Sequence, residues 1–326
     1  MKKEVIIGID GGGTHTRVAV SDLDGNILGF AKGGGVHPKK NKTPDKNVKL
    51  TIAEALKQAG EPLESVVKVV AGFAGLNRDA DYDWAKSYLE MDGLCAEKSI
   101  LNDAVIAQYG AFLGEPGIIA VSGTGSNVVG KTEAGDFISN RYFHHLPHAS
   151  ARYLSYFVIY DLISKKEKEE NKELTEKVLR YWNVEHVEDL RQLAASGFHG
   201  YELNAIKELS NMAELVTDAA TKGNEIALQA CEKVAEGLMI GIRLVASLFE
   251  NEHVKVSFAG SVANSRPVSE KLLRKMKSKD SLKRLTYQEP ALTPVLGAIL
   301  YGLRDHHMNP DIKMIENWKK EYMENH

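Results

Sequence analysis

The sequence predicts an α/β fold in two lobes. Its 326 residues are too many for one small hydrophobic core and suit two domains of ordinary size. Short apolar runs alternate with helical patterns through the first third of the chain, which is typical of a sheet covered by helices. A strand, a glycine turn and a returning strand occur at 5–21 and again at 117–131. The repeat indicates that the second lobe begins as the first does.

The elements of the first lobe follow from hydrophobic periodicity. The apolar run at 5–9 predicts a buried strand, and the alternating, β-branched residues 16–21 predict its antiparallel partner. The other expected elements are strands at 27–32, 66–71 and 99–101 and helices at 43–59, 80–91 and 104–113. Gly114-Glu115-Pro116-Gly117 then interrupts the pattern, so we place the domain boundary there, between lobes of 1–116 and 117–326.

The second lobe is expected to be mostly helical after its opening strands. The expected elements are strands at 117–122, 127–131 and 254–259, helical segments through 149–249, a helix at 265–277 and a last helix at about 294–326, able to pack back on the N-terminal lobe. We interpret the charged stretch 164–172 as a solvated helix face or loop. Gly237 and Gly241, one helical turn apart, are expected to pack in the core.

Composition points to small-molecule chemistry. The chain has 41 basic and 44 acidic residues, a formal charge of −3 and no basic stripe for nucleic acid. The apolar run near the amino terminus is too short for a signal peptide or a membrane span, so we expect a cytoplasmic protein without a membrane partner. Cys95 and Cys231 lie far apart without metal-ligand spacing, which argues against a disulfide framework or a zinc site.

The first hairpin turn has the composition of a phosphate-binding loop. Residues 10–16 read Asp-Gly-Gly-Gly-Thr-His-Thr. Glycines let backbone N–H groups approach an anion, and Thr14 and Thr16 add hydroxyl donors. Asp10, at the strand end, could hold Mg²⁺ through water. The turn is neither a Walker A loop nor a dinucleotide fingerprint, because no Gly-Lys-Ser/Thr follows and the next element is a strand. A glycine-rich turn without a ligand is the alternative.

Asp103 is the candidate general base. Its carboxylate lies at the end of a predicted strand and beside a helix start, where it could take the proton from an attacking hydroxyl. The alternative is a helix N-terminal cap, which the helix dipole favours. The sequence does not separate these two roles, and one residue can fill both.

Four segments in this order carry a resemblance to a known superfamily: residues 10–17, Leu101 to Ala104, Ser122 to Asn127, and Ala259 to Val262. They resemble the sugar kinases, actin and heat-shock chaperone ATPases, and within these the N-acetylglucosamine kinase and BadF-type ATPase family. The resemblance covers essentially the full length. It implies a two-lobed actin-like ATPase (ribonuclease H-like) fold, a nucleotide cleft between the lobes, and the cofactors ATP and Mg²⁺.

The resemblance also implies roles for single residues. Its nucleotide contacts are Asp10, Gly12, Gly13 and Thr14 in the first loop, Gly123, Thr124 and Gly125 in the second, and Ala213, Gly260 and Ser261 near the adenosine. Its sugar contacts are Ser126, Asn127 and Asp103. Dimers are common in the family, so a homodimer is expected by analogy.

The chain departs from the family on the acceptor side. Kinases of this branch carry Gly-Asp-Glu-Gly-Ser after the second loop, and here Pro147 and His148 stand where the glycine and aspartate belong. His37 replaces an asparagine after the early glycine turn. We therefore place His37 and His148 among the expected acceptor contacts.

Three interpretations of this departure stay open. The first is a kinase whose histidines, with Arg141 or Arg152, suit a more anionic acceptor. The second is a nucleotide-binding sugar sensor or a slow BadF-type ATPase with a lost or altered acceptor site. The third is a metal site at His144, His145 and His148.

The leading expectation is an ATP- and Mg²⁺-dependent kinase with Asp103 as general base. It would phosphorylate a hydroxyl of an amino sugar, namely N-acetylglucosamine, glucosamine or a related hexose. An iron–sulfur ATPase activator is discounted, because no cysteine lies between Cys95 and Cys231.

Overall fold

The chain forms two compact units. The structure is a computed structural model that describes residues 3–38, 41–76, 79–166, 168–198, 203–278 and 281–322. The first unit comprises Met1–Ile119, Val129–Ile138 and Gln288–His326, and the second comprises Ala120–Val128 and Ser139–Tyr287. The predicted α/β class is confirmed by two five-stranded sheets with helices. The predicted boundary at 116/117 stays a prediction about domains.

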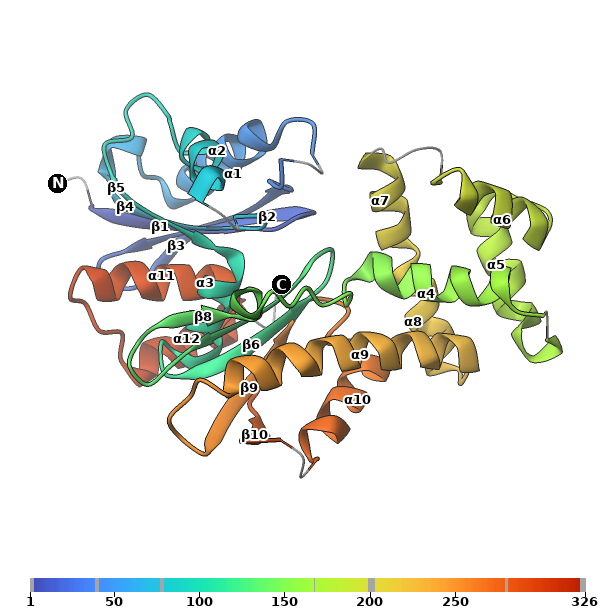
Figure 1. The fold of residues 1–326 in the computed structure, drawn as a ribbon. Coiled ribbons are helices and arrows are strands. Elements are labelled where there is room, and N and C mark those ends of the chain that lie inside the picture. The colour runs from blue at the N-terminus through green and yellow to red at the C-terminus, as the bar shows by residue number, and fades with distance from the viewer. Residues whose placement is uncertain are drawn as a thin grey trace. The chain divides into compact units, whose positions relative to one another are not determined.

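The first sheet has the order β3-β2-β1-β4-β5 (Figure 1). Its strands are β1 Val5–Gly11, β2 His15–Asp22, β3 Ile27–Gly34, β4 Val66–Phe73 and β5 Glu97–Asn102. Strands β1, β2 and β3 pair antiparallel, whereas β4 and β5 continue the sheet in parallel with β1. This register places Asp10 between Arg17 on β2 and Gly72 on β4. The predicted opening hairpin is confirmed.

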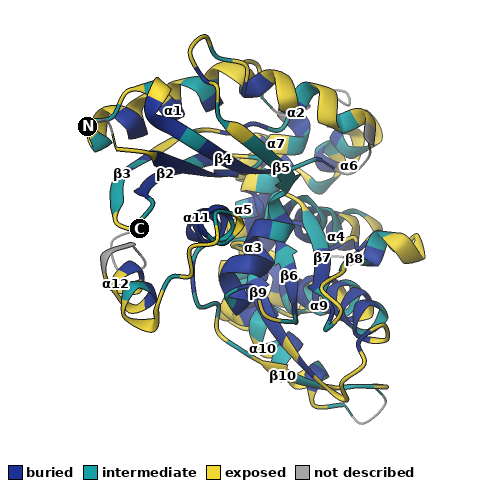
Figure 2. Cartoon of the chain, turned by 90° about the vertical axis from the view of Figure 1, so that its left-hand side faces the viewer, coloured by how far each residue is buried: buried dark blue, intermediate teal, exposed yellow. Residues whose placement is uncertain are grey.

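Helices cover both faces of this sheet. In Figure 1, α1 (Pro44–Ala59) and α2 (Tyr82–Tyr88) lie on one face, and α3 (Asp103–Phe112) and α11 (Pro294–Asp305) lie on the other. Figure 2 shows α1 with a buried face toward the strands and an exposed outer face. Alternate residues of β1 supply both cores, since Ile7 and Ile9 belong to the cluster beneath α1 and Ile6 to the cluster beneath α11.

The carboxyl-terminal segment is two helices rather than the single one predicted at about 294–326. Helix α11 ends at Asp305, and α12 runs over Ile312–Tyr322. His307 has a left-handed backbone (φ 59°), and Pro310 lies just before the second helix begins. A left-handed residue and a proline both interrupt a helix, which explains the break.

The second sheet has the order β10-β9-β6-β7-β8. Its strands are β6 Gly117–Ser122, β7 Ser126–Lys131, β8 Phe137–Ser139, β9 His253–Ala259 and β10 Arg284–Tyr287. The predicted strand, turn and strand at 117–131 are confirmed as β6 and β7. The chain changes from one unit to the other within β6 and again within β7.

The predicted helical stretch at 149–249 is also confirmed. Its α-helices are α4 Ala151–Ser164, α5 Lys172–Trp182, α6 Val187–Ala195, α7 Leu203–Asn211, α8 Ala213–Thr221 and α9 Glu225–Ala246, and α10 (Arg266–Met276) follows β9. Short 3₁₀ helices are η1 Leu63–Ser65, η2 Asp79–Asp81, η3 Asn140–Phe143 and η4 Glu169–Asn171. Over the described residues, we find no helix with the length and apolar character that crossing a bilayer requires.

Candidate active site

The first predicted phosphate loop is a tight turn with an accessible tip. The Gly12 N–H donates to the His15 carbonyl at 2.8 Å, which closes the turn between β1 and β2. Gly12 and Gly13 are half-buried and Thr14 is exposed, so an anion can reach their backbone. A Cβ on Gly11 would come within 2.4 Å of the Phe73 ring. The structure therefore requires glycine where the chain turns.

Thr16 has a different environment from the turn that precedes it. It is fully buried, and its hydroxyl donates to the Gly34 carbonyl at 2.5 Å. This hydrogen bond joins β2 to β3. The side chain serves strand pairing in the structure, and a contact between Thr16 and ATP stays a prediction.

Asp10 provides a buried carboxylate directly before the turn. Its side chain lies near the end of β1, and Oδ2 is 3.3 Å from Nη1 of Arg17 on β2. Burial raises the pKa of Asp10 and outweighs the opposing effect of the Arg17 charge. A carboxylate directly before a half-buried glycine turn fits Mg²⁺, which takes one or two protein carboxylates together with waters and substrate phosphates.

Asp103 is the first residue of α3, but it is not the helix cap. The cap is Asn102, whose side-chain oxygen accepts from the Ala104 N–H at 3.0 Å. Asn102 also donates to the Leu76 carbonyl at 2.8 Å, which fixes the loop after β4 beside the helix start. Asp103 is half-buried and lies at the positive end of the α3 dipole.

His37 lies close to the first turn. A single side chain, Asn41, donates to the carbonyls of Gly13 and of His37, each at 3.1 Å. The His37 ring packs on Gly75, where a Cβ would come within 2.8 Å of the imidazole. The structure thus places the predicted acceptor contact His37 next to the first glycine turn, within the first unit.

In the second unit, two predicted nucleotide-binding turns lie side by side. The Gly123 N–H donates to the Gly125 carbonyl at 2.9 Å, and a Cβ on Gly123 would lie 3.8 Å from the Gly260 Cα. Gly260 has φ 90°, and a Cβ there would come within 2.4 Å of the Ser122 carbonyl. That carbonyl accepts the N–H groups of Val262 and Ala263 at 3.0 and 3.1 Å. Only glycine allows this approach.

Three other predicted contact residues of the second unit make hydrogen bonds or contacts within the protein. The Ser126 hydroxyl donates to the Pro147 carbonyl at 2.9 Å, and the Asn127 side-chain oxygen accepts from the Ser139 hydroxyl at 3.2 Å. Ala213 is the first residue of α8 and is buried. Their predicted roles toward ligands stay predictions.

Residues 141–152, where the sequence departs from the family pattern, include the exposed His148, whose ring stacks on an aromatic side chain. The His148 ring stacks on Tyr153, with centroids 4.6 Å apart and an interplanar angle of 15°. The Arg152 guanidinium lies 4.9 Å from the centroid of the Tyr153 ring and donates to the Tyr153 hydroxyl at 3.2 Å. Burial, with the charge of His148, lowers the pKa of the half-buried His145. Tyr153 was not among the predicted site residues, because an aromatic at a helix start usually indicates core packing.

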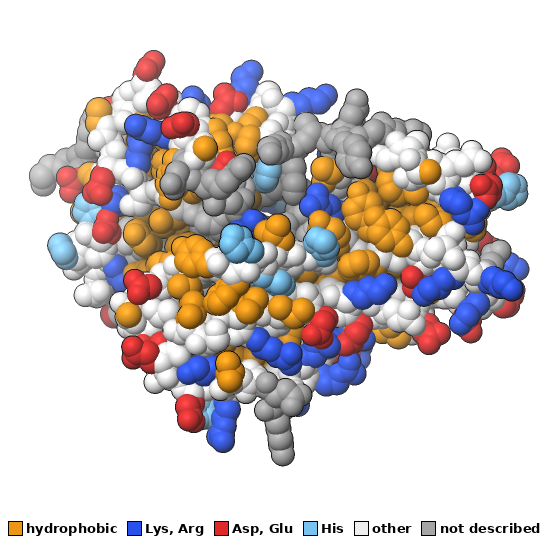
Figure 3. Space-filling model, in the orientation of Figure 1, with side chains coloured by type: hydrophobic (Ala, Val, Ile, Leu, Met, Phe, Trp, Pro, Cys, Tyr) orange, Lys and Arg blue, Asp and Glu red, His pale blue; other side chains and the backbone are white. Residues whose placement is uncertain are grey.

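The third interpretation, a metal site at His144, His145 and His148, is wrong. Among the residues that the structure describes, no three His, Cys, Asp or Glu side chains are grouped closely enough to hold a metal ion. On the face drawn in Figure 3, histidine side chains lie next to hydrophobic ones. Exposed hydrophobic residues of this segment include Tyr142 and Leu146, which offer no metal ligand.

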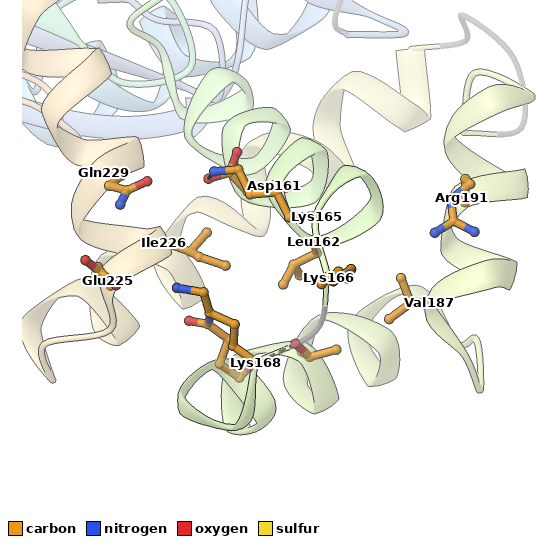
Figure 4. Close-up of a pocket in the computed structure, with 12 residues that line it drawn as sticks. Asp161, Leu162, Lys165, Lys166, Lys168, Val187, Arg191, Glu225, Ile226 and Gln229 are labelled. Atoms are coloured by element: carbon orange, nitrogen blue, oxygen red, sulfur yellow. Dashed lines mark hydrogen bonds and ion pairs between the residues drawn. The ribbon is translucent and has the colours of Figure 1, made fainter.

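A cavity of about 270 Å³ lies in the helical part of the second unit (Figure 4). Figure 4 shows Glu225 and Gln229 of α9 on one side of it and Val187 and Arg191 of α6 on the other. Part of the charged stretch lines the cavity, with Lys165 paired to Asp161 at 2.9 Å. It shares no residue with the predicted site, so it is not the predicted nucleotide or acceptor pocket.

The protein belongs to the BadF/BadG/BcrA/BcrD ATPase family, whose profile matches residues 7–302. It is 25% identical over 268 residues to an N-acetylmuramic acid/N-acetylglucosamine kinase of Clostridium acetobutylicum, covering 80% of this chain and 86% of the relative. It is 30% identical over 121 residues to a glucosamine kinase of Vibrio cholerae, covering 37% of this chain and 41% of that protein.

Solved structures show the fold. A Chromobacterium violaceum protein solved as a candidate N-acetylglucosamine kinase has a TM-score of 0.72 and 22% identity, covering 92% of this chain and 99% of that one. A ROK family glucokinase of Streptomyces griseus has a TM-score of 0.56 and 18% identity, covering 93% and 98%. The predicted family and the predicted actin-like ATPase fold are both confirmed.

Proposed function

We propose that the protein is an ATP-dependent kinase that phosphorylates a hydroxyl of an amino sugar, with Asp103 as the general base. The observation that carries the proposal is the start of α3, where Asn102 caps the helix and Asp103 follows it. A carboxylate at this place can accept the proton of an attacking hydroxyl. Curated relatives are kinases of N-acetylmuramic acid, N-acetylglucosamine and glucosamine, which supports the acceptor class.

The ATP phosphates are assigned to the two glycine turns. Backbone N–H groups of Gly13 and Thr14, and of Thr124 and Gly125, would donate to phosphate oxygens, while the N–H groups of Gly12 and Gly123 close the two turns. Asp10 would hold Mg²⁺ through water, and the metal, when bound, neutralises charge on the phosphoryl group. Gly260 and Ser261 are assigned to the adenosine, since they lie against Gly123 in the same unit. Ala213 is proposed as a further contact at the start of α8.

The acceptor contacts that we propose are Asp103, His37, Ser126, Asn127 and His148. His148 is exposed on its Tyr153 support, with the Arg152 guanidinium against the same ring. Imidazole and guanidinium groups donate hydrogen bonds to anions. We therefore expect the acceptor to include sugars with an anionic substituent, such as a carboxylate.

A second candidate function is a nucleotide-binding sugar sensor or slow ATPase. The observation that favours it is that Ser126 and Asn127 hydrogen-bond to groups of the protein, on Pro147 and Ser139. Such a protein would keep the phosphate turns and lose transfer to an acceptor.

A screen of ADP release separates the two functions. The purified protein is given ATP and Mg²⁺ with N-acetylglucosamine, glucosamine, N-acetylmuramic acid or glucose, and a reaction without sugar is the control. The kinase requires release that depends on the sugar and yields a phosphorylated sugar by mass spectrometry. Equal, slow release with every compound and without any would contradict the kinase and support the ATPase.

A further inference from the structure

We infer that Asn140 is a positioning residue for the acceptor: it fixes residues 145–149 against β7 and thereby orients His148. The inference rests on the proposed kinase function. Asn140 begins η3 and is fully buried. Its side-chain oxygen accepts from the Val128 N–H at 2.9 Å, and its Nδ2 donates to the His145 carbonyl at 2.7 Å. One buried amide therefore joins the strand after the phosphate turn to the start of the acceptor segment.

Further hydrogen bonds continue this attachment along the segment. The Ser126 hydroxyl donates to the Pro147 carbonyl at 2.9 Å, and the Ser122 hydroxyl donates to the Ala149 carbonyl. The carbonyls of residues 145, 147 and 149 thus all accept from side chains that belong to, or are bonded to, β6 and β7. His148 therefore lies between Pro147 and Ala149, whose carbonyls are both held by hydrogen bonds.

Helix α9 confines the segment from another side. A Cβ on Gly241 would lie 2.9 Å from Val128 Cγ2 and 3.4 Å from the His145 ring. A Cβ on Gly237, one turn earlier, would meet only ordinary contacts, the nearest 3.6 Å away on Ala149. The two glycines therefore face residues 145–149 and β7. A side chain at Gly241 would have to displace Val128 and press on the His145 ring.

The Asn140 side chain holds residues 145–149, and it takes no part in the hydrogen bond that closes the glycine turn at 123–125. That turn is closed by the Gly123 N–H on the Gly125 carbonyl at 2.9 Å. Loss of the amide removes the hydrogen bond to the His145 carbonyl, whereas the backbone bond from the His145 N–H to the Asn140 carbonyl at 3.3 Å remains. The backbone that leads to His148 is then held less firmly. We expect the acceptor to bind less well and ATP to bind as before.

The test compares Asn140→Ala with a matched control, Asn171→Ala. Asn171 is another buried amide of the second unit, bonded at 3.1 Å to Asn224 in the helical part. In steady-state kinetics, Asn140→Ala should raise the acceptor KM by about 10- to 100-fold, the loss expected when a hydrogen bond to a charged acceptor group is broken, with the ATP KM within about 2-fold of wild type. Asn171→Ala should change neither. An unchanged acceptor KM in an active Asn140→Ala enzyme would overturn the inference.

Two glycine variants test the same segment without removing the amide. Gly241→Ala should also raise the acceptor KM selectively, because its Cβ meets Val128 and His145. Gly237→Ala is the control for placing alanine in α9 and should behave as wild type. Equal acceptor KM values for the two variants would count against the inferred role of the segment.

A readout without catalysis separates failure of the inference from failure of the proposed function. If the wild type phosphorylates no sugar, the proposed kinase function is wrong. The His145 imidazole can then be titrated by NMR in each variant. Asn140 Nδ2 also lies 3.2 Å from the His145 Nδ1. Asn140→Ala removes this neighbour and should move the His145 pKa up toward its ordinary value of about 6.5, whereas Asn171→Ala should leave it low. The same low pKa in both variants would overturn the positioning role of Asn140.

Discussion

The side chain of Asn102 caps helix α3 on the backbone N–H of Ala104, 3.0 Å away. Asp103 Oδ1 lies 3.0 Å from the same N–H, but Asp103 is already the first helical residue. The cap therefore persists when the Asp103 carboxylate is changed. This arrangement allows the catalytic and structural roles of the helix start to be measured separately.

Asp103→Asn should lower kcat about 10²- to 10⁴-fold, the usual contribution of a general base. The amide keeps the size of the side chain but takes up no proton. ATP affinity, measured by calorimetry, and the melting temperature should stay close to wild type. Asn102→Ala is the control, which should lose about 1 kcal/mol of stability because the cap is removed. Full turnover by Asp103→Asn would refute the assigned base.

The Asp10–Arg17 pair should set the acid limit of Mg²⁺-dependent ATP binding. Burial raises the pKa of Asp10, and the Arg17 charge opposes the rise. The carboxylate binds a cation only when ionised, so affinity is full above this pKa and is lost as pH falls through it. Arg17→Leu should move the loss to higher pH, measured by calorimetry over a series of pH values.

Lys3→Met is the matched control for this pH profile. Lys3, just before β1, pairs at 3.2 Å with Asp22, the last residue of β2, at the end of that strand opposite to the glycine turn. It should leave the pH dependence of ATP binding as in wild type. An Arg17→Leu profile that coincides with wild type would show that Asp10 does not govern the acid limit.

The sequence predicted the fold where a local pattern determines it. The opening hairpin, the repeat at 117–131 and the helices of 149–249 each carry their own periodicity. Strand β10 was missed, because its four residues, Arg284–Tyr287, are mostly exposed and show no apolar run. The terminal helix was drawn too long, because its break needs the left-handed backbone of His307, which a single sequence does not reveal.

The site was predicted less completely, because side-chain direction depends on tertiary pairing. Thr16 follows the glycine turn and reads as a phosphate donor, yet the pairing of β2 with β3 turns its hydroxyl to Gly34. Asn140 carries no motif, and its role comes from the Val128 N–H, 12 residues before it, and the His145 carbonyl, 5 residues after it. Only the folded chain brings these groups to one amide.

Replacing Lys68 should lower the stability of the protein less than removing the two carboxylates that pair with it. It is fully buried on β4 and binds Glu97 at 2.7 Å and Asp305, whose side chains are 69% and 45% exposed. Burial disfavours its charge, but the two carboxylates outweigh this and raise the pKa of Lys68. Glu97→Gln with Asp305→Asn leaves a buried unpaired ammonium and should cost about 3–5 kcal/mol.

Lys68→Met should cost no more than about 1 kcal/mol, because exposed carboxylates stay hydrated without it. Urea unfolding of the two variants measures the difference. The raised pKa gives a second check. The stability that the Lys68 charge contributes is complete below its unfolded pKa of about 10.4 and is lost as pH rises through the folded pKa. Only proteins that keep Lys68 with both carboxylates should therefore show this loss of stability at high pH. Equal destabilisation of both variants would contradict the argument.

Gly297 is expected to be the least replaceable position of α11. A Cβ there would lie 2.3 Å from the Ile106 carbonyl and 2.6 Å from the Gly110 nitrogen, both backbone atoms of α3. Gly297→Ala should therefore push apart two helices of the first unit and cost about 1–3 kcal/mol or more, although alanine itself favours a helix by about 1 kcal/mol. Because α3 begins at Asp103, kcat should fall as well.

Gly302→Ala, on the same helix, is the graded control. Its Cβ would meet the side chains of Ile6 at 2.8 Å and Val70 at 3.2 Å, and side chains can shift more readily than backbone. Urea unfolding should rank Gly297→Ala well below Gly302→Ala in stability, and only Gly297→Ala should lower kcat. If the two alanine variants were equally stable and equally active, close backbone contact between α3 and α11 would not be what positions Asp103.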